Sequence, residues 1–335
     1  MRKNNAAVSA VSALVLAAGV LAGAAAVPAA ADTGHTGHTG GMGDMSGMGH
    51  SGSAPASGSA SERLPAVSAK SPAVSLVARL DGAQEVPTPG GPAVGDKDGR
   101  AVALVKVKGD RVTFALSWQG IGAPTLGHVH EGKAGANGAV KTGLFTTAMP
   151  AGVHSAAGQT VTDAALAERL RTDPGGFYVN LHSAEFPGGA VRGQLKRLRG
   201  SVNPLAIIKG GGLRALADGS QEVPAEDPKK VGDPDGHAVT FLHPGHRSVE
   251  YSLAWVNIAE PVAGHIHQGV QGKNGAVKVP LFTTPVPQNI FAVSGSVAVA
   301  DAAVLRQIKK HPTGFYSNLH TSEFPDGAVR GQLFH

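Results

Sequence analysis

The chain has 335 residues, of which 16% are charged and 4% aromatic, with 47 glycines, 22 prolines and no cysteine. The lack of cysteine excludes disulfides, thiolate metal sites, a cysteine nucleophile and a lipidated cysteine. Lysine and arginine exceed aspartate and glutamate by 29 − 24 = 5 without forming a basic block, which argues against a nucleic-acid binder. Many turn-forming residues and few charges favour an all-β fold.

Residues 1–31 have the three-part form of a secretory signal peptide. Arg2 and Lys3 precede an apolar run over about residues 10–27, and the small residues Ala29 and Ala31 suit cleavage after Ala31. The alternative is an uncleaved membrane anchor, for which the apolar run is only marginally long. We therefore expect a secreted, extracellular protein that is not attached to the membrane after cleavage.

Residues 32–73 are predicted to be disordered, with a His/Met/Gly-rich tail at 32–50 and then a Ser/Ala/Pro linker. The tail offers imidazole and thioether ligands at short spacings: His35, His38, Met42, Met45, Met48 and His50. Thioethers select cuprous copper, and imidazole suits copper in either oxidation state. We expect this tail to bind copper; the alternative is a flexible linker with incidental histidine and methionine.

The rest of the chain is a duplication, with predicted domains at 74–198 and 212–335 and a linker at 199–211. Gly127-His128-Val129-His130 returns as Gly264-His265-Ile266-His267, and both histidines are offset by 137 residues. A Tyr-x-Asn-Leu-His stretch follows at 178–182 and again at 316–320. A shared offset over paired motifs indicates a repeat rather than chance.

The predicted elements have the same order in both halves. In the first half, a strand at 75–80 and a Gln-Glu-Val-Pro turn precede a hairpin at 101–107 and 112–118, whose apolar residues alternate. The His-x-His strand and another near 144–147 come next, followed by a helix at 163–172. Strands with Tyr-x-Asn-Leu-His and Val-Arg-Gly-Gln-Leu close the half. In the second half the helix falls at 301–310, and we expect Trp118 and Trp255 in the core.

These motifs resemble the chordin-type, or CHRD, domain in two tandem copies. The matching set is Gln-Glu-Val-Pro, His-x-His-x-Gly with Asn-Gly, Tyr-x-Asn-Leu-His and Gly-Ala-Val-Arg-Gly-Gln-Leu, in the same order in both halves. The resemblance implies extracellular all-β modules. We expect two tandem antiparallel β-sandwiches of Greek-key type, each with one short helix. The resemblance implies no enzymatic activity, because function depends on sites rather than folds.

Three histidines in each half are candidate metal ligands. Residues two apart in a strand face the same way, so His128 and His130 project together, and the same holds for the second copy. If the Tyr-x-Asn-Leu-His strand lies alongside, each half gathers three imidazoles, which suit copper, with zinc as the alternative. The predicted metal ligands of the two domains are His128, His130, His182, His265, His267 and His320.

A structural network is the alternative interpretation of the same region. In it, the histidines hydrogen-bond the backbone of loops and polar side chains, because buried polar groups need partners. The residues of this predicted network are Glu85, Asn180, Arg192, Glu222, Asn318 and Arg330. We expect the two arginines to form bidentate ion pairs, with Glu185 and Glu323 or with Glu85 and Glu222.

Two further comparisons between the halves narrow the set of candidate site residues. Glu131 is replaced by Gln268, so a carboxylate at this position is not expected to be an obligatory ligand. His243 and His246 have no counterparts in the first half and are expected in a solvated turn.

We therefore expect a non-enzymatic, secreted protein that binds metal, with copper as the ion, and that also serves as an interaction module. One alternative is a structural or adhesive exoprotein that binds protein or polysaccharide without a metal. Another is a copper enzyme, because the His-x-His strand is similar to the copper-ligand strand of copper/zinc superoxide dismutase. That enzyme's bridging histidine, zinc-loop ligands and disulfide have no counterparts here.

Overall fold

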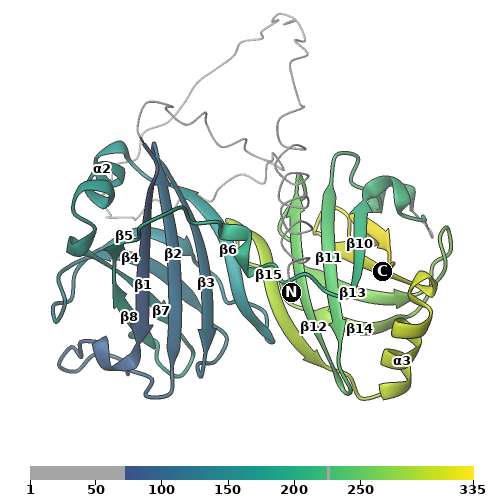
Figure 1. The fold of residues 1–335 in the computed structure, drawn as a ribbon, viewed down its shortest axis with the longest axis horizontal. Helices are drawn as coiled ribbons and strands as arrows, with labels where there is room; N and C mark the ends of the chain where they lie inside the picture. The colour runs from purple at the N-terminus through teal and green to yellow at the C-terminus, as the bar shows by residue number, and fades with distance from the viewer. Residues whose placement is uncertain (1–71, 225–226) are drawn as a thin grey trace, which may run out of the picture.

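The computed structural model describes residues 72–224 and 227–335. The predicted signal peptide, the His/Met tail and the linker as far as residue 71 lie outside the described residues. The described part is an all-β structure with two similar domains (Figure 1). Its two α-helices have nine residues each, and neither is long and apolar enough to cross a membrane.

The first domain contains nine strands and one α-helix among the described residues. They are β1 (Val74–Asp81), β2 (Arg100–Lys108), β3 (Arg111–Gln119), β4 (Leu126–Glu131), β5 (Val140–Phe145), β6 (Val153–Val161), α2 (Ala164–Thr172), β7 (Phe177–His182), β8 (Val191–Gln194) and β9 (Lys196–Arg197). Two short 3-10 turns interrupt the series, η1 (Gly82–Gln84) and η2 (Pro174–Gly176).

The second domain repeats this order after a short link. The link contains η3 (Pro204–Ile207). The elements that follow are β10 (Leu213–Asp218), η4 (Gly219–Gln221), η5 (Pro228–Lys230), β11 (His237–Pro244), β12 (Ser248–Val256), β13 (Ala263–Gln268), β14 (Val277–Phe282), β15 (Ile290–Ala298), α3 (Ala302–Lys310), η6 (Pro312–Gly314), β16 (Phe315–His320) and β17 (Val329–Gln332).

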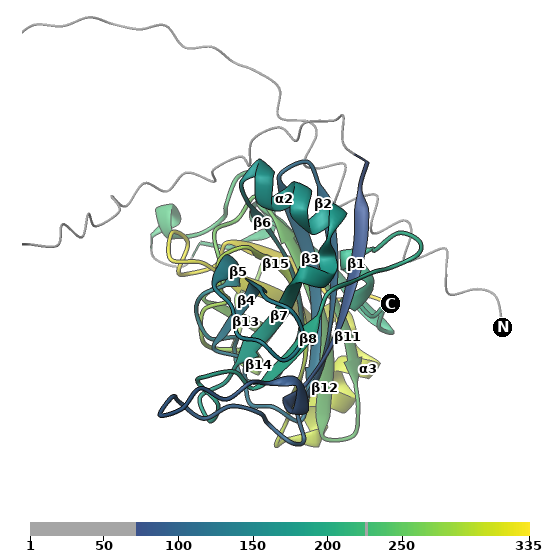
Figure 2. The same ribbon diagram turned by 90° about the vertical axis from the view of Figure 1, so that its left-hand side faces the viewer.

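Two antiparallel sheets face each other in the first domain. The large sheet has the order β1, β2, β3, β6, and the small sheet the order β5, β4, β7, β8. The sheets meet where Asp81 of β1 pairs with Arg192 of β8. Figure 2 shows the small sheet beside the large one. The all-β, two-domain prediction is therefore confirmed.

Alternation along each strand places the core between the two sheets. On β3, Val112, Phe114, Leu116 and Trp118 point inward and are at most 6% exposed. On the small sheet, Val129 of β4 and Phe177, Val179 and Leu181 of β7 also enter this core. Because successive side chains point to opposite faces, the histidines on either side of Val129 face outward.

The predicted helices are confirmed, with their caps. Asp163 accepts a hydrogen bond from the backbone N–H of Leu166, and Asp301 accepts one from Ala303. Each helix is followed by a proline, Pro174 or Pro312, which lies in a 3-10 turn. The chain then enters β7 or β16, the strand with the Tyr-x-Asn-Leu-His motif.

The two domains join through their large sheets. β6 pairs with β15 in antiparallel register, with Ser155 opposite Ser294 and Ala157 opposite Ala292. The pairing makes one continuous sheet, β1, β2, β3, β6, β15, β12, β11, β10, and Figure 1 shows β6 and β15 side by side at the centre. Ile207 of η3 packs against small and apolar residues on one face of this junction. The link therefore covers one face of the junction between β6 and β15.

Candidate metal centre

Strand pairing brings three histidines together on the outer face of each small sheet. β4 pairs with β7, which places His128 opposite Asn180 and Leu126 opposite His182. His128 and His130 lie two residues apart on β4, so all three rings share one face. Candidate ligand atoms of His128, His130 and His182 all lie within 4.8 Å of one another.

The second domain has the same arrangement. β13 pairs with β16, and His265, His267 and His320 offer ligand atoms within 4.8 Å of one another. Ring centroids in the two groups are 5.0–6.3 Å apart where they are in contact. We call the two groups centre 1 and centre 2. Among the described residues, no other group of three metal-ligating side chains has this geometry.

Backbone carbonyls fix which ring nitrogen of each histidine faces the centre. In centre 1, Nδ1 of His130 lies 3.0 Å from the oxygen of Gly138, and Nδ1 of His182 lies 2.9 Å from the oxygen of Pro187. A carbonyl oxygen only accepts, so Nδ1 carries the proton in both rings. Their Nε2 atoms therefore present lone pairs. This is how metal-binding histidines are usually oriented.

Three ring nitrogens of centre 1 are buried and have no hydrogen-bond partner: His128 Nδ1, His130 Nε2 and His182 Nε2. Centre 2 has the same carbonyl contacts, from His267 Nδ1 to Gly275 O and from His320 Nδ1 to Pro325 O, both at 2.9 Å. There, His265 Nδ1 lies 3.2 Å from His320 Nε2, and His267 Nε2 has no partner.

Burial favours the neutral form of four of these imidazoles, His128, His130, His265 and His267. It lowers the pKa of His128 to about 4, and the neighbouring His182 and His130 lower it further. Burial also lowers the pKa of His265 to about 4 and lowers that of His130 and His267, against the opposing effect of their carbonyl partners. A neutral imidazole is the form that binds a metal, so proton competition at neutral pH is weak.

A stack of side chains supports one histidine of each centre. The ring of Tyr178 stacks on His130 at a centroid distance of 4.8 Å, and the guanidinium carbon of Arg192 lies 3.5 Å from the tyrosine centroid. In the second domain, Tyr316 stacks on His267 at 4.8 Å, with Arg330 at 3.6 Å. Sequence reasoning assigned no role to these tyrosines, although Tyr178 and His182 share a face by alternation.

The predicted ion pairs of the buried arginines are wrong. Arg192 is 1% exposed and donates to Asn137 Oδ1 and to the carbonyls of Lys133 and Ala136. Arg330 does the same for Asn274, Val270 and Lys273. Among the described residues, neither arginine forms an ion pair with a carboxylate. The loop after β4 or β13 folds over the guanidinium, and its oxygens occupy the donors.

The predicted hydrogen bonds of the network are present in part. Asn180 donates to Glu85 at 3.4 Å, and Asn318 donates to Glu222 at 3.2 Å. The histidines bond to loop carbonyls rather than to these asparagines or glutamates. Glu185 and Glu323 make no hydrogen bond or ion pair to the arginines.

Glu131 follows His130 at the end of β4 and lies in an exposed ion-pair cluster; we call this position, with Gln268 of the second domain, the rim. Arg169 and Lys141 both bind its carboxylate, with Lys141 Nζ at 3.0 Å. Hydrogen bonds from Arg169 and then Lys141 lower the pKa of Glu131 to about 2. The carboxylate is thus held away from the three histidines.

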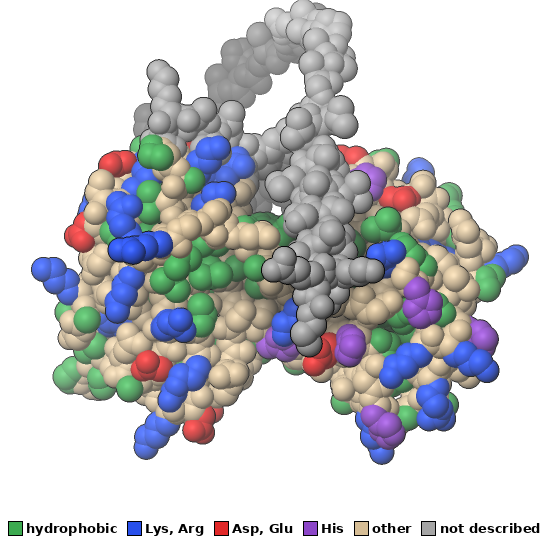
Figure 3. Space-filling view, in the orientation of Figure 1, with side chains coloured by type: hydrophobic (Ala, Val, Ile, Leu, Met, Phe, Trp, Pro, Cys, Tyr) green, Lys and Arg blue, Asp and Glu red, His purple; other side chains and the backbone are tan. Residues whose placement is uncertain are grey.

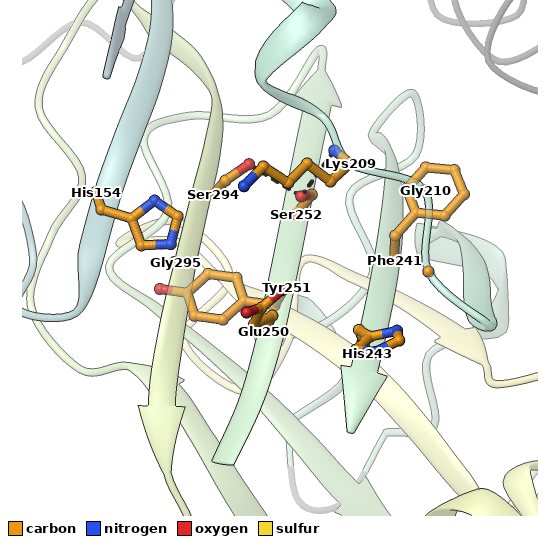
Figure 4. A pocket seen from close by; sticks show the side chains of 11 residues that line it. His154, Lys209, Gly210, Phe241, His243, Glu250, Tyr251, Ser252, Ser294 and Gly295 are labelled. Carbon is orange, nitrogen blue, oxygen red and sulfur yellow. Dashed lines mark hydrogen bonds between the residues drawn. The ribbon is translucent and has the colours of Figure 1, made fainter. Parts of the chain in front are cut away.

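A separate pocket lies at the junction of the domains. Lys209 and Gly210 of the link line it together with His154 of β6, His243 of β11 and Glu250 of β12 (Figure 4). His243 thus lies in a strand and not in the predicted turn. The pocket's serines, Ser252 and Ser294, bond to each other and to the link, so they offer no free group to a ligand.

A family model for the CHRD domain matches residues 76–195 and 213–333. The chain belongs to the CHRD domain family. The two matches show tandem CHRD domains, as the motifs predicted, and each match contains one complete group of three histidines. No curated protein and no solved structure matched the chain. Within each CHRD domain, the motifs that identify the family are also the residues that build the centre.

Proposed function

We propose that this CHRD protein binds two transition-metal ions in its folded part, one at centre 1 and one at centre 2. The observation that carries the proposal is the convergence of three histidines in each domain, with three buried ring nitrogens without a partner in centre 1 and one, His267 Nε2, in centre 2. A buried polar atom without a partner costs about 1–3 kcal/mol, and a bound cation would supply the missing partner.

Copper is the proposed ion, with zinc as the alternative. An all-imidazole set with an open fourth position suits either ion, whereas oxygen-seeking Mg²⁺ and Ca²⁺ prefer carboxylates. The His/Met tail at 32–50, which lies outside the described residues, adds thioethers that favour cuprous copper. We propose that the protein acts outside the cytoplasmic membrane, following its predicted signal peptide, and that binding rather than catalysis is its role.

The two alternative functions predict different behaviour. An adhesive exoprotein would bind protein or polysaccharide equally well with and without metal. The face shown in Figure 3 carries lysines and arginines scattered over both domains rather than gathered in one patch, which gives no support to nucleic acid as the partner. A dismutase-like enzyme requires superoxide turnover by the metal-loaded protein, which we do not expect.

Metal analysis of the full-length protein, purified without an affinity tag, tests the proposal. We expect two ions that are lost when His128→Ala and His265→Ala are combined. The matched control removes two histidines outside the centres, His243→Ala with His246→Ala, and should keep both ions. Replacing the six tail ligands separately removes any ions bound there. If the metal content follows the tail alone and ignores His128 and His265, the proposal fails.

A further inference from the structure

A partly buried glutamate packs against the row of side chains next to each centre. The register places His128 opposite Asn180 and Asn180 opposite Arg192, so these side chains form one row across the small sheet. Glu85, from the loop after η1, reaches this row and accepts a hydrogen bond from Asn180. Glu222 reaches the equivalent row of the second domain in the same way.

A glycine packs closely against each glutamate. Gly189 and Gly327 both have φ of 138°, which side chains rarely adopt, and a Cβ there would lie 2.7 Å and 2.5 Å from the nearest carboxylate oxygen of Glu85 and Glu222. Any residue other than glycine would therefore displace the glutamate. Such an enclosed carboxyl group has little access to water.

The hydrogen-bond pattern fits a neutral carboxylic acid. In the first domain, Glu85 Oε1 and Asn180 Oδ1 are both buried and without a partner, and the second domain repeats this for Glu222 and Asn318. Both open atoms are acceptors, so a proton on the carboxyl group would supply a donor that the pair otherwise lacks. In agreement, burial raises the pKa of Glu85 and Glu222 to about 7, against the lowering effects of the arginine and the asparagine.

The state of this carboxyl group changes the charge next to the centre. Arg192 of β8 and Asn180 of β7 both face Glu85. Among the described residues, Arg192 is the charged side chain that interacts electrostatically with Glu85. The loop oxygens that bind Arg192 are neutral, and an ionised Glu85 offsets its charge. Through Tyr178, the same arginine stacks toward His130.

We propose that Glu85 and Glu222 select the charge of the ion bound at centre 1 and centre 2. With the glutamate protonated, the buried arginine disfavours positive charge, and the centre holds a monovalent ion better than a divalent one. With the glutamate ionised, its negative charge offsets that of the arginine, and the affinity for the divalent ion increases most. This inference rests on the proposed metal binding, and it makes each glutamate a specificity-determining residue that is not itself a ligand.

The test compares Zn²⁺ with Ag⁺, which have fixed charges, in the full chain and in the variant Glu85→Gln with Glu222→Gln. From pH 6 to pH 8, the wild-type affinity for Zn²⁺ should rise about tenfold more than that of the variant. For Ag⁺, the wild-type affinity should rise about threefold more than that of the variant, because the electrostatic interaction scales with ion charge. These sizes follow for a unit charge about 10 Å away at an effective dielectric constant of about 40. Comparison with the variant removes the contribution of histidine titration.

The outcomes separate this inference from the proposed function. If neither ion binds in a way that depends on His128 and His265, the proposed function itself has failed. If both ions bind there but wild type and variant give parallel pH profiles, charge selection by the glutamates is overturned while metal binding stands. If the wild-type affinity rises more than that of the variant by the same factor for both ions, charge selection is also overturned.

A measurement on the wild-type protein covers the case of a variant that does not fold. Because linkage is reciprocal, saturation with Zn²⁺ should lower the apparent pKa of both glutamates by about one unit. Carboxyl carbon shifts in nuclear magnetic resonance, followed between pH 5 and pH 9, report this directly. A pKa of Glu85 and Glu222 that is the same with and without Zn²⁺ would overturn the inference.

Discussion

Centre 1 and centre 2 agree in their interior and differ at their rim. Inside, the three histidines, the two loop carbonyls, the stacked tyrosine and the buried arginine recur with nearly the same distances. At the rim, Glu131 with its ion pairs stands where the second domain has Gln268. The two copies have thus diverged in exposed charge while keeping the geometry around the ring nitrogens.

This difference indicates which residues a function shared by both centres requires. A group that differs between two otherwise matching centres is not required by what both do, whereas the carbonyl contacts of the histidines and the stack of arginine, tyrosine and histidine are present twice. The four predictions that follow begin with interior groups and end at the rim, and the expected effects decrease in the same order.

Removing one ligand should abolish one centre and leave the other intact. In the full chain with its tail ligands replaced, His128→Ala should weaken Zn²⁺ binding at centre 1 by more than about 100-fold, since even indirect partners of a metal site are worth about 10–100-fold. Isothermal titration should then show one ion per chain in place of two. His265→Ala is the matched variant for centre 2. Loss of both ions in either single variant would contradict independent centres.

Removing a buried arginine should destabilise its own domain strongly. Arg192→Ala leaves Asn137 and two loop carbonyls without their donor and removes the support of Tyr178, so we expect a loss of about 3 kcal/mol in the free energy of unfolding. Urea denaturation measures it. The exposed Arg79→Ala is the control. A loss below about 1 kcal/mol for Arg192→Ala would show that the loop holds without the guanidinium.

Acid should destabilise the metal-free protein through its histidines. The pKa of His128 and His265 is about 4 when folded, below the ordinary value of 6.5. The unfolded state therefore binds the proton first. The stability that these histidines contribute is full above pH 6.5, falls as the pH drops from 6.5 to about 4, and is constant below that range, whereas the raised pKa of Glu85 and Glu222 acts in the opposite sense between about pH 7 and 4.5. After discounting for partial exposure, we expect about 1 kcal/mol per histidine.

A pair of variants checks the origin of this acid effect. As the pH drops from 6.5 to 4, the urea midpoint of the variant His128→Asn with His265→Asn should fall less, or rise more, than that of wild type. An unchanged slope would assign the acid sensitivity to other groups.

The smallest effect is expected at the rim. Glu131→Gln gives centre 1 the residue that centre 2 has at position 268, and we expect its Zn²⁺ affinity to change by less than about twofold, as is typical of exposed ion pairs. Titration calorimetry at matched ionic strength measures this. A decrease of tenfold or more would make Glu131 a ligand and would end the equivalence of the two centres.

Much of the fold was predictable because its signals are local or repeated. Alternation over Val112–Trp118 placed a half-buried strand, and Asp163 with Pro174 marked the ends of a helix. The duplication then doubled each observation. The grouping of the three histidines was predictable only on condition that β4 and β7 are neighbours, because alternation gives the face of a strand and not its partner.

Other features depend on contacts that no local pattern encodes. The pairing of β6 with β15 involves small residues such as Ala156 and Ala157, in a segment where no strand was predicted. The partners of Arg192 were predicted as carboxylates because opposite charges attract, yet the loop after β4 brings carbonyl oxygens to the guanidinium. The contacts of the Gly138 and Pro187 carbonyls with His130 and His182 could not be predicted, because every residue has a backbone carbonyl.

The most direct test is a crystal structure of the protein loaded with zinc or copper, with anomalous scattering recorded at the metal edge. We predict one peak in each domain, bound by His128 Nδ1, His130 Nε2 and His182 Nε2 in the first and by the equivalent atoms of His265, His267 and His320 in the second, at about 2.0–2.1 Å. Peaks confined to other residues, or folded domains without a peak at saturating metal, would contradict the account.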